Sequence, residues 1–321
     1  MAGPKAREEL AFLFPGQGSQ SLGMMGSLSE EFGIVSDRFQ EASEVLGFDL
    51  WKLVLDGPIE NLNLTENTQP AILAASVSTW DIWNTCDGQQ PTIMCGHSFG
   101  EYSALVCAGA ISYLDAVKLV ATRGQLMQKS GSGGVGSMAA ILGLPKEILN
   151  EICAKVSSIG ICDCANFNSP GQIVISGQPE AISAACAEAK ASGAKRALVL
   201  PVSVPAHSRL MSSAAKEFSE YLLDIEIHAP KVRILHNVDV MSHSKPEEIR
   251  LALEQQLYSP VKWDDTINQL FDLGYRKGYE CGPGKILSGL AKRTNLEFEC
   301  IPLVDRATIE AQISKNGNSE S

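Results

Sequence analysis

A serine between two glycines stands where a short strand is expected to turn into a helix. Ser98 lies in the stretch GHSFG at 96–100, after the apolar, β-prone run 91–95 and before the apolar run 101–108. Glycines two residues on either side let the backbone turn sharply and let neighbouring elements approach closely. Such a turn holds the hydroxyl outward near the free N–H groups of a helix N-terminus, as a nucleophilic serine requires. The alternative is a tight turn in which Ser98 only caps the helix.

A nucleophilic serine needs a base, and the chain offers five histidines. His97 is adjacent to Ser98 in sequence, so its side chain is expected to point away from the hydroxyl. His207 follows two prolines that stiffen the loop 201–206, and a histidine on a rigid loop is well placed to project into a cleft. Among the five histidines, His207 is therefore the best-placed candidate for the general base. The remaining histidines are interpreted as surface or structural residues: His228, His236 and His243.

The elements that must position these residues follow an α/β pattern with one interruption. A buried strand is predicted at 10–14, and a later one at 275–280. Between 137 and 202 the predicted order is β-α-β-β-α-β, which is the ferredoxin-like unit. Helices are predicted at 30–46, 70–83, 113–129, 211–223, 246–256 and 264–273. The glycine-serine stretch 130–136 is interpreted as a linker or mobile loop, and the polar tail 316–321 as disordered.

These patterns predict the fold class and the domain organisation. The nucleophile turn and the α/β order indicate a large α/β-hydrolase-like domain with a parallel sheet core, formed by 1–136 and 203–321. The segment 137–202 is predicted to be an inserted ferredoxin-like subdomain, whose length suits a small domain.

Composition and charge restrict the class of protein. The formal net charge of −11 argues against nonspecific nucleic-acid binding, and no apolar run is long enough to cross a bilayer. The N-terminal residues lack the hydrophobic segment of a signal peptide. Nine cysteines without a C-x-x-C pair favour free thiols in a reducing compartment over disulfides or zinc. We predict a cytoplasmic protein, without membrane contact, metal or redox cofactor.

Five motifs, taken together and in order, resemble the malonyl-CoA:acyl carrier protein transacylases of bacterial-type fatty acid synthesis. The resemblance covers nearly the whole chain, from Leu10 to about Arg306. The motifs are FPGQGSQ at 14–20, GHSFGE at 96–101, RGQLM at 123–127, VPAHS at 204–208 and GPGK at 282–285.

The resemblance implies a ping-pong reaction without a cofactor. Ser98 would attack the thioester of malonyl-CoA and become a malonyl ester, while His207 would take the serine proton and protonate the departing thiolate. The phosphopantetheine thiol of acyl carrier protein, a transient partner, would then take the acyl group. In the family a main-chain carbonyl orients the histidine, and the matching residue here is Gln256. The enzyme is expected to work as a monomer.

The resemblance also assigns the groups that bind the substrate. Backbone N–H groups would stabilise the oxyanion, and they match Gln17 and Phe99, the second of which follows the nucleophile at a helix start. Arg123 lies on a mostly apolar helix, where its guanidinium can hold the free carboxylate of malonate by two parallel hydrogen bonds. The alternative for Arg123 is an arginine that reaches solvent or pairs with a nearby acid.

Three asparagines are weaker candidates for the substrate site. Asn166 and Asn168 match a family segment close to the acyl group, although residues 168–171 are also simply a good turn. Asn237 is included on similar grounds.

Two other functions remain open from the sequence. An α/β-hydrolase-type serine hydrolase would share the GHSFG turn, but its acid and histidine follow in a different order, and Arg123 would lack a role. The second alternative function is that of a catalytically inactive scaffold that binds carrier protein. The joint presence of Ser98, Arg123 and His207 argues against this alternative.

Overall fold

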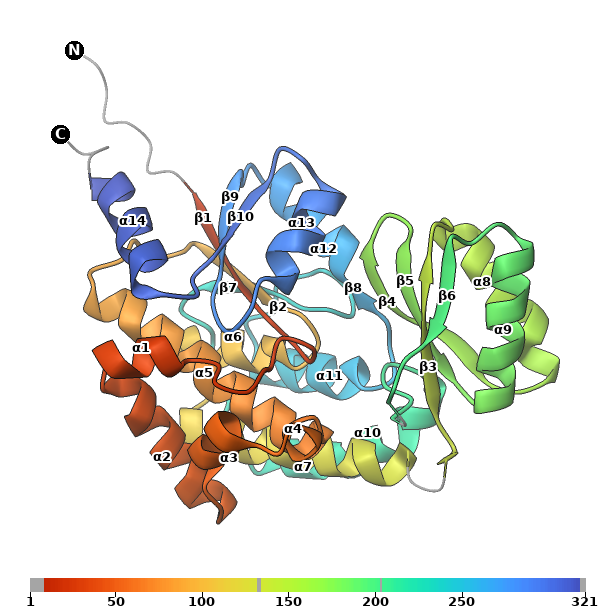
Figure 1. Cartoon of the computed structure of the whole chain (residues 1–321), viewed down its shortest axis with the longest axis horizontal. Helices are drawn as coiled ribbons and strands as arrows, with labels where there is room; N and C mark the ends of the chain where they lie inside the picture. The colour runs from red at the N-terminus through yellow and green to blue at the C-terminus, as the bar shows by residue number, and fades with distance from the viewer. Residues whose placement is uncertain (1–8, 132–133, 203, 318–321) are drawn as a thin grey trace.

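The computed structural model describes residues 9–131, 134–202 and 204–317, and these contain two five-stranded sheets (Figure 1). All strand pairs of the first sheet are parallel, in the order β10-β9-β1-β2-β7. The predicted α/β fold with a parallel sheet core is therefore confirmed. The five strands are β1 (Leu10–Phe14), β2 (Ile93–Gly96), β7 (Arg233–Leu235), β9 (Lys277–Glu280) and β10 (Glu299–Pro302).

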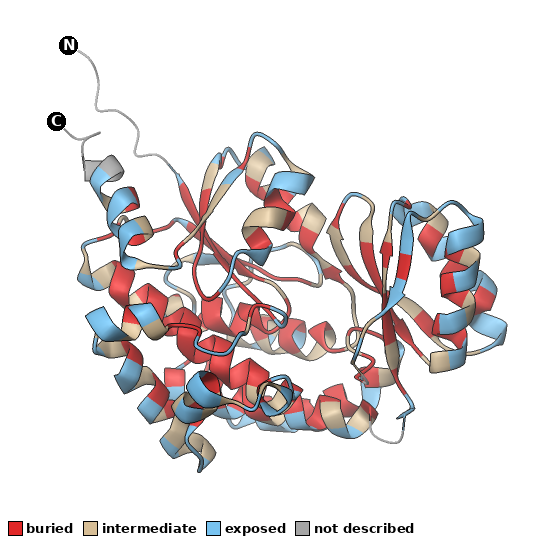
Figure 2. Cartoon of the chain, viewed as in Figure 1, coloured by how far each residue is buried: buried red, intermediate tan, exposed pale blue. Residues whose placement is uncertain are grey.

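The first sheet is covered on both faces, which is why its central strand β1 is apolar throughout. All five residues of β1 are buried. Phe12 and Phe14 point into one core, whereas Ala11 and Leu13 point into another on the opposite face. Alternate residues of a strand face opposite sides of its sheet, so a doubly covered strand has no polar positions. Figure 2 shows this burial along the central strands and the helices beside them.

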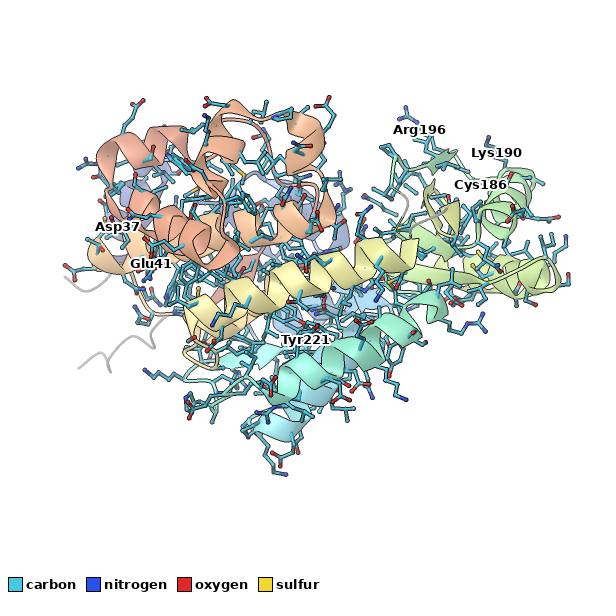
Figure 3. All side chains as sticks on the ribbon, turned by 90° about the horizontal axis from the view of Figure 1, so that it is seen from below. Asp37, Glu41, Cys186, Lys190, Arg196 and Tyr221 are labelled. Atoms are coloured by element: carbon cyan, nitrogen blue, oxygen red, sulfur yellow. The ribbon has the colours of Figure 1, made fainter. Side chains whose placement is uncertain are left out.

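Helices from both halves of the chain supply these two cores. Figure 3, seen from below, shows α7 (Tyr113–Gly131, yellow) beside α10 (Ser212–Leu223, green-blue), and α5 (Thr65–Thr85) packs on α7. The helices of the first half are α1 (Gly26–Glu31), α2 (Ile34–Leu46), α3 (Leu50–Asp56), α4 (Ile59–Leu62), α5 (Thr65–Thr85), α6 (Gly100–Cys107) and α7 (Tyr113–Gly131). Those of the second half are α10 (Ser212–Leu223), α11 (Pro246–Gln256), α12 (Trp263–Asp272), α13 (Ile286–Thr294) and α14 (Arg306–Gly317).

The second sheet has the order β6-β3-β5-β4-β8 and a core of its own. Its elements are β3 (Ser137–Leu142), α8 (Lys146–Lys155), β4 (Cys162–Ser169), β5 (Gln172–Gly177), α9 (Pro179–Ala191) and β6 (Arg196–Val199). This is the predicted β-α-β-β-α-β order. A short strand from the other half of the chain, β8 (Val261–Lys262), pairs in parallel with β4. The boundaries 137 and 202 of the inserted subdomain stay a prediction.

Several predicted element boundaries are wrong. The helix predicted at 30–46 is two helices, α1 and α2, separated at Phe32 and Gly33. The helix predicted from Pro70 begins at Thr65, because the turn before the proline is buried and packing outweighs the lost hydrogen bond.

Two segments predicted to lack regular structure are partly helical. Residues 130–131 of the predicted linker belong to α7, and 132–133 lie outside the described residues. Residues 316–317 of the predicted disordered tail belong to α14, and 318–321 lie outside the described residues. Helix α14 is anchored because Ile309 is buried in the main core and Arg306 pairs with Glu31.

Candidate active site

The candidate residues gather at one edge of the first sheet. The turn that contains Gln17 follows β1, the Ser98 turn follows β2, and Asn237 follows β7. Because β1, β2 and β7 are parallel neighbours, the loops after them meet at the same edge, where ligands bind in open α/β sheets.

The turn at Ser98 has the strained geometry of a nucleophile elbow. Ser98 has a φ of 53°, in the left-handed region that residues other than glycine rarely adopt. A Cβ at Gly96 would collide with the backbone of Gly100, and a Cβ at Gly100 would collide with the carbonyl of Phe14. Both glycines are therefore required for the elbow to pack against β1. The strain and the close packing support a nucleophilic role over simple helix capping.

Ser98, His207 and Gln256 form a continuous hydrogen-bonded chain. Ser98 Oγ lies 2.8 Å from His207 Nε2, and His207 Nδ1 lies 2.7 Å from the backbone carbonyl oxygen of Gln256. A carbonyl oxygen only accepts, so Nδ1 carries the hydrogen and donates it. In the neutral imidazole, Nε2 then presents its lone pair to the serine hydroxyl. This is the arrangement required for a serine activated by a general base.

The surroundings of His207 keep its imidazole neutral. Burial and, second, the positive charge of Arg123 lower the pKa of His207 to about 3. His207 is therefore ready to accept a proton at neutral pH. Any anion that neutralises Arg123 removes the second cause and makes His207 a stronger base.

Arg123 is a buried cation whose hydrogen-bond partners among the described residues include no carboxylate. Its side chain comes from α7, is 1% exposed, and donates from Nη2 to Ser98 Oγ at 3.3 Å. The neutral oxygens of Gln69 and Gln256 accept from Nη1 and Nη2 at 3.1 Å and 3.0 Å. Its Nε has no partner in the described part of the chain. Neither alternative from the sequence holds, because Arg123 is buried from solvent and forms no ion pair with an acid among the described residues.

A buried carboxylate that the sequence reasoning missed holds the parts of the site together. Glu101, the residue after the elbow glycine, is fully buried. Its Oε2 accepts from Gln256 Nε2 at 2.9 Å and from the backbone N–H of Asn237 at 2.9 Å, and also from Asn237 Nδ2. Its Oε1 accepts from His236 Nδ1 at 2.6 Å. An acidic residue within an otherwise apolar helical run was the available signal.

The other predicted residues fall into two groups. Gln17, Phe99, Asn166 and Asn168 line a cavity of about 410 Å³ that also contains Ser98, Arg123 and His207. Asn237 lies outside this lining. It is buried under the elbow, where its Oδ1 accepts from the Ser98 backbone N–H at 2.8 Å and its Nδ2 donates to the Gly96 carbonyl at 2.7 Å.

The cavity lies between the elbow and the second sheet. Met138 of β3, Asn166 of β4 and Val174 of β5 contribute to its wall. Asn168 also contacts the elbow directly, since its Oδ1 lies 2.8 Å from His97 Nε2. The backbone N–H groups of Gln17 and Phe99 make no hydrogen bond within the described residues. Both are therefore available to an oxyanion formed next to Ser98.

Two absences can be stated for the described residues. Among them no cluster of three or more His, Cys, Asp or Glu side chains is suited to hold a metal ion. No helix in the described ranges has the length and apolar character needed to cross a membrane.

Comparison with known proteins places this chain in a class. The acyl transferase domain family matches residues 11–310. The malonyl CoA-acyl carrier protein transacylase of Haemophilus influenzae is 47% identical over 305 residues, which cover 95% of this chain and 98% of the relative. The chain is thus an acyltransferase, which decides against the hydrolase and the inactive scaffold.

Solved structures define the family further. The malonyl CoA-acyl carrier protein transacylase of Coxiella burnetii superposes with a TM-score of 0.95 at 45% identity, covering 96% of this chain and 98% of the other. A malonyl-transacylase in complex with its type II PKS acyl-carrier protein gives a TM-score of 0.94 at 46% identity, covering 96% and 100%. The chain belongs to the malonyl CoA-acyl carrier protein transacylases.

Proposed function

We propose that this enzyme moves a malonyl group from malonyl-CoA to the phosphopantetheine thiol of an acyl carrier protein, through an ester of Ser98, in fatty acid biosynthesis. The observation that carries the proposal is the buried guanidinium of Arg123, which lies 3.3 Å from the nucleophile and has no carboxylate partner among the described residues. A buried charge without a counter-ion is costly, so the site favours an acyl group that brings its own carboxylate.

In the first half-reaction, Ser98 Oγ attacks the thioester carbonyl while His207 Nε2 takes the hydroxyl proton. The tetrahedral oxyanion accepts hydrogen bonds from the backbone N–H groups of Gln17 and Phe99. Collapse breaks the carbon–sulfur bond, and the CoA thiolate leaves with the proton from His207. The malonyl ester of Ser98 remains, and Nδ1 of His207 stays bonded to the Gln256 carbonyl throughout.

In the second half-reaction, the carrier thiol occupies the place that CoA has left. His207 Nε2 takes the thiol proton, the sulfur attacks the ester carbonyl, and Ser98 Oγ leaves with that proton. The same base and the same oxyanion donors therefore serve both halves. The free thiol of the carrier replaces that of CoA, so no cofactor is consumed.

Binding of the malonyl carboxylate and the chemistry at Ser98 are coupled through charge. A carboxylate on Arg123 neutralises the guanidinium that helps to depress the pKa of His207. The correct substrate therefore strengthens the base that activates Ser98. We further propose that Asn166 and Asn168 face the acyl group, and that Asn237 holds the elbow from beneath.

The partners and setting complete the proposal. The enzyme is proposed to act as a cytoplasmic monomer that binds malonyl-CoA and, transiently, acyl carrier protein, with no metal, redox cofactor, nucleic acid or membrane. The family relationship supports the two substrates.

Discharge of the acyl-enzyme tests the proposed reaction. The enzyme is loaded with labelled malonyl-CoA, freed from excess substrate, and mixed with either holo-carrier or buffer. We expect rapid transfer of label to the holo-carrier thiol and slow release to water. Release to water at the same rate with and without holo-carrier would contradict the proposal. The apo-carrier, which lacks the thiol, is the matched control.

A further inference from the structure

The partners that hold Arg123 share one property, which is that they accept hydrogen bonds without carrying a charge. Gln69 Oε1 and Met127 Sδ each accept from Nη1 at 3.1 Å, and Gln256 Oε1 accepts from Nη2 at 3.0 Å. The guanidinium is therefore fixed in direction, and no carboxylate among the described residues contacts it; the buried Glu101 acts on its charge only from beyond the Gln256 amide. Because the side chain is 1% exposed, water screens that charge poorly.

The amide of Gln256 cannot turn round to present its nitrogen to Arg123. Its Nε2 donates to the backbone carbonyl of Ser98 at 3.1 Å and to Glu101 Oε2 at 2.9 Å. Both of these partners accept, so the nitrogen must face them and the oxygen must face Arg123. Gln69 is oriented in the same sense, because its Nε2 lies 3.7 Å from Met127 Sδ.

Glu101 is the acid of this network, and it is kept one side chain away from the guanidinium. Its two oxygens accept from His236, from Gln256 and twice from Asn237. The Gln256 amide thus stands between the carboxylate and Arg123. A carboxylate in direct contact would form a charge-assisted pair with the guanidinium, and a substrate carboxylate would have to displace it.

We propose that Gln69 and Gln256 form a neutral clamp on Arg123 that determines the preference for acyl groups bearing a carboxylate. Arg123 lines the cavity, and the clamp holds its guanidinium there with a charge that no carboxylate among the described residues contacts. Glu101 serves the clamp as a positioning residue by fixing the Gln256 amide. This inference rests on the proposed malonyl transfer and names the residues that set its specificity.

Gln69→Glu tests the clamp with the smallest chemical change. It replaces the Gln69 amide nitrogen, whose hydrogen-bond acceptor among the described residues is the Met127 sulfur, with an oxygen, and it places a negative charge beside Nη1. We expect the ratio of kcat/KM for malonyl-CoA to that for acetyl-CoA to fall by about 10- to 100-fold, mainly through the malonyl value. Gln69→Met, which removes the acceptor without adding charge, is the control and should lower the ratio much less.

A second pair of variants tests the same clamp in case the Gln69 variants do not fold. Met127 lies one helical turn after Arg123 on α7, so Met127→Glu places a carboxylate next to Nη1, and Met127→Gln is its neutral control. The malonyl-to-acetyl ratio should fall with the glutamate and much less with the glutamine, in proteins whose thermal unfolding shows them folded.

The outcomes distinguish failure of the clamp from failure of the proposed function. An unchanged ratio in both folded glutamate variants would overturn the clamp and leave the proposed function standing. An equal fall with charged and neutral replacements would show that Gln69 and Met127 matter only for packing. A wild-type enzyme that transfers no malonyl group to the carrier would overturn the proposed function and the clamp with it.

Discussion

Replacing Glu101 by leucine should remove most of the stability of the fold, because the carboxylate satisfies four buried N–H groups. These belong to His236 Nδ1, Gln256 Nε2, and the backbone and side chain of Asn237. Each buried donor left without an acceptor costs about 1–3 kcal/mol. The Gln256 and Asn237 amide groups keep one backbone acceptor each, so the lower part of that range applies to them. The expected loss, on the order of 4–8 kcal/mol, is comparable with the whole stability of a typical domain.

Glu101→Gln is the matched variant that separates charge from hydrogen bonding. A glutamine oxygen can occupy the Oε2 position and keep three of the four acceptor contacts. Its amide nitrogen then faces His236 Nδ1, which must accept rather than donate. Burial disfavours the charged form of His236, and it is the Glu101 carboxylate that raises the pKa of this histidine overall. Without the carboxylate, His236 is expected to be neutral and can supply the lone pair.

Urea unfolding of the wild type and the two variants measures these effects. We expect Glu101→Gln to unfold within about 2 kcal/mol of the wild type and to keep malonyl transfer within about tenfold. Glu101→Leu should be unfolded or should unfold at a far lower urea concentration. A Glu101→Leu protein as stable as the wild type would refute the view that this carboxylate holds the site together, and so would a Glu101→Gln protein as unstable as Glu101→Leu.

Three further predictions concern catalysis. Arg123→Ala should lower kcat/KM for malonyl-CoA by about 30- to 4,000-fold, because about 2–5 kcal/mol is lost when a buried carboxylate loses its charged partner. The kcat/KM for acetyl-CoA, which has no carboxylate, should stay near the wild-type value. An equal fall of kcat/KM for both substrates would show that Arg123 has only a structural role. His207→Ala should slow both half-reactions by about 10²-fold or more in stopped-flow assays, whereas slowing of the CoA half alone would require a second base for the carrier thiol. Because the pKa of His207 is lowered to about 3, its base form persists as the pH falls from 7 and is lost only near that value. In Arg123→Ala this pKa should rise while burial keeps it below the ordinary value, so the acid limb of acetyl transfer should move to higher pH; an unmoved limb would contradict the charge coupling.

The parts of the site with local signals were the ones predictable from sequence. Glycines at fixed offsets mark the turn at Ser98, and prolines mark the loop before His207, because these residues restrict the backbone within a few positions. The β-α-β-β-α-β order of the second sheet also follows from local periodicity. The roles of Gln17, Phe99, Arg123 and Gln256 came from the family resemblance rather than from local pattern.

What the sequence did not reveal depends on contacts between distant segments. Gln69 lies 54 positions before Arg123 and carries no local pattern that marks it as a partner. Glu101 meets Gln256 across 155 positions, and only its presence in an apolar helix sets it apart. The predicted start of the helix at Pro70 was wrong for a similar reason. Burial of the turn before Pro70 is a tertiary effect, which local helix propensity does not contain.

Peptide mapping of the acyl-enzyme tests the central claim most directly. The protein is mixed with malonyl-CoA, quenched within milliseconds to seconds in acid, digested, and analysed by mass spectrometry for the malonyl adduct. We predict a single adduct on Ser98 that forms together with the release of CoA in the absence of carrier, that disappears as malonyl-carrier forms on addition of holo-carrier, and that is absent from folded Ser98→Ala. A malonyl adduct on another residue, or malonyl transfer by Ser98→Ala at the wild-type rate, would contradict the account.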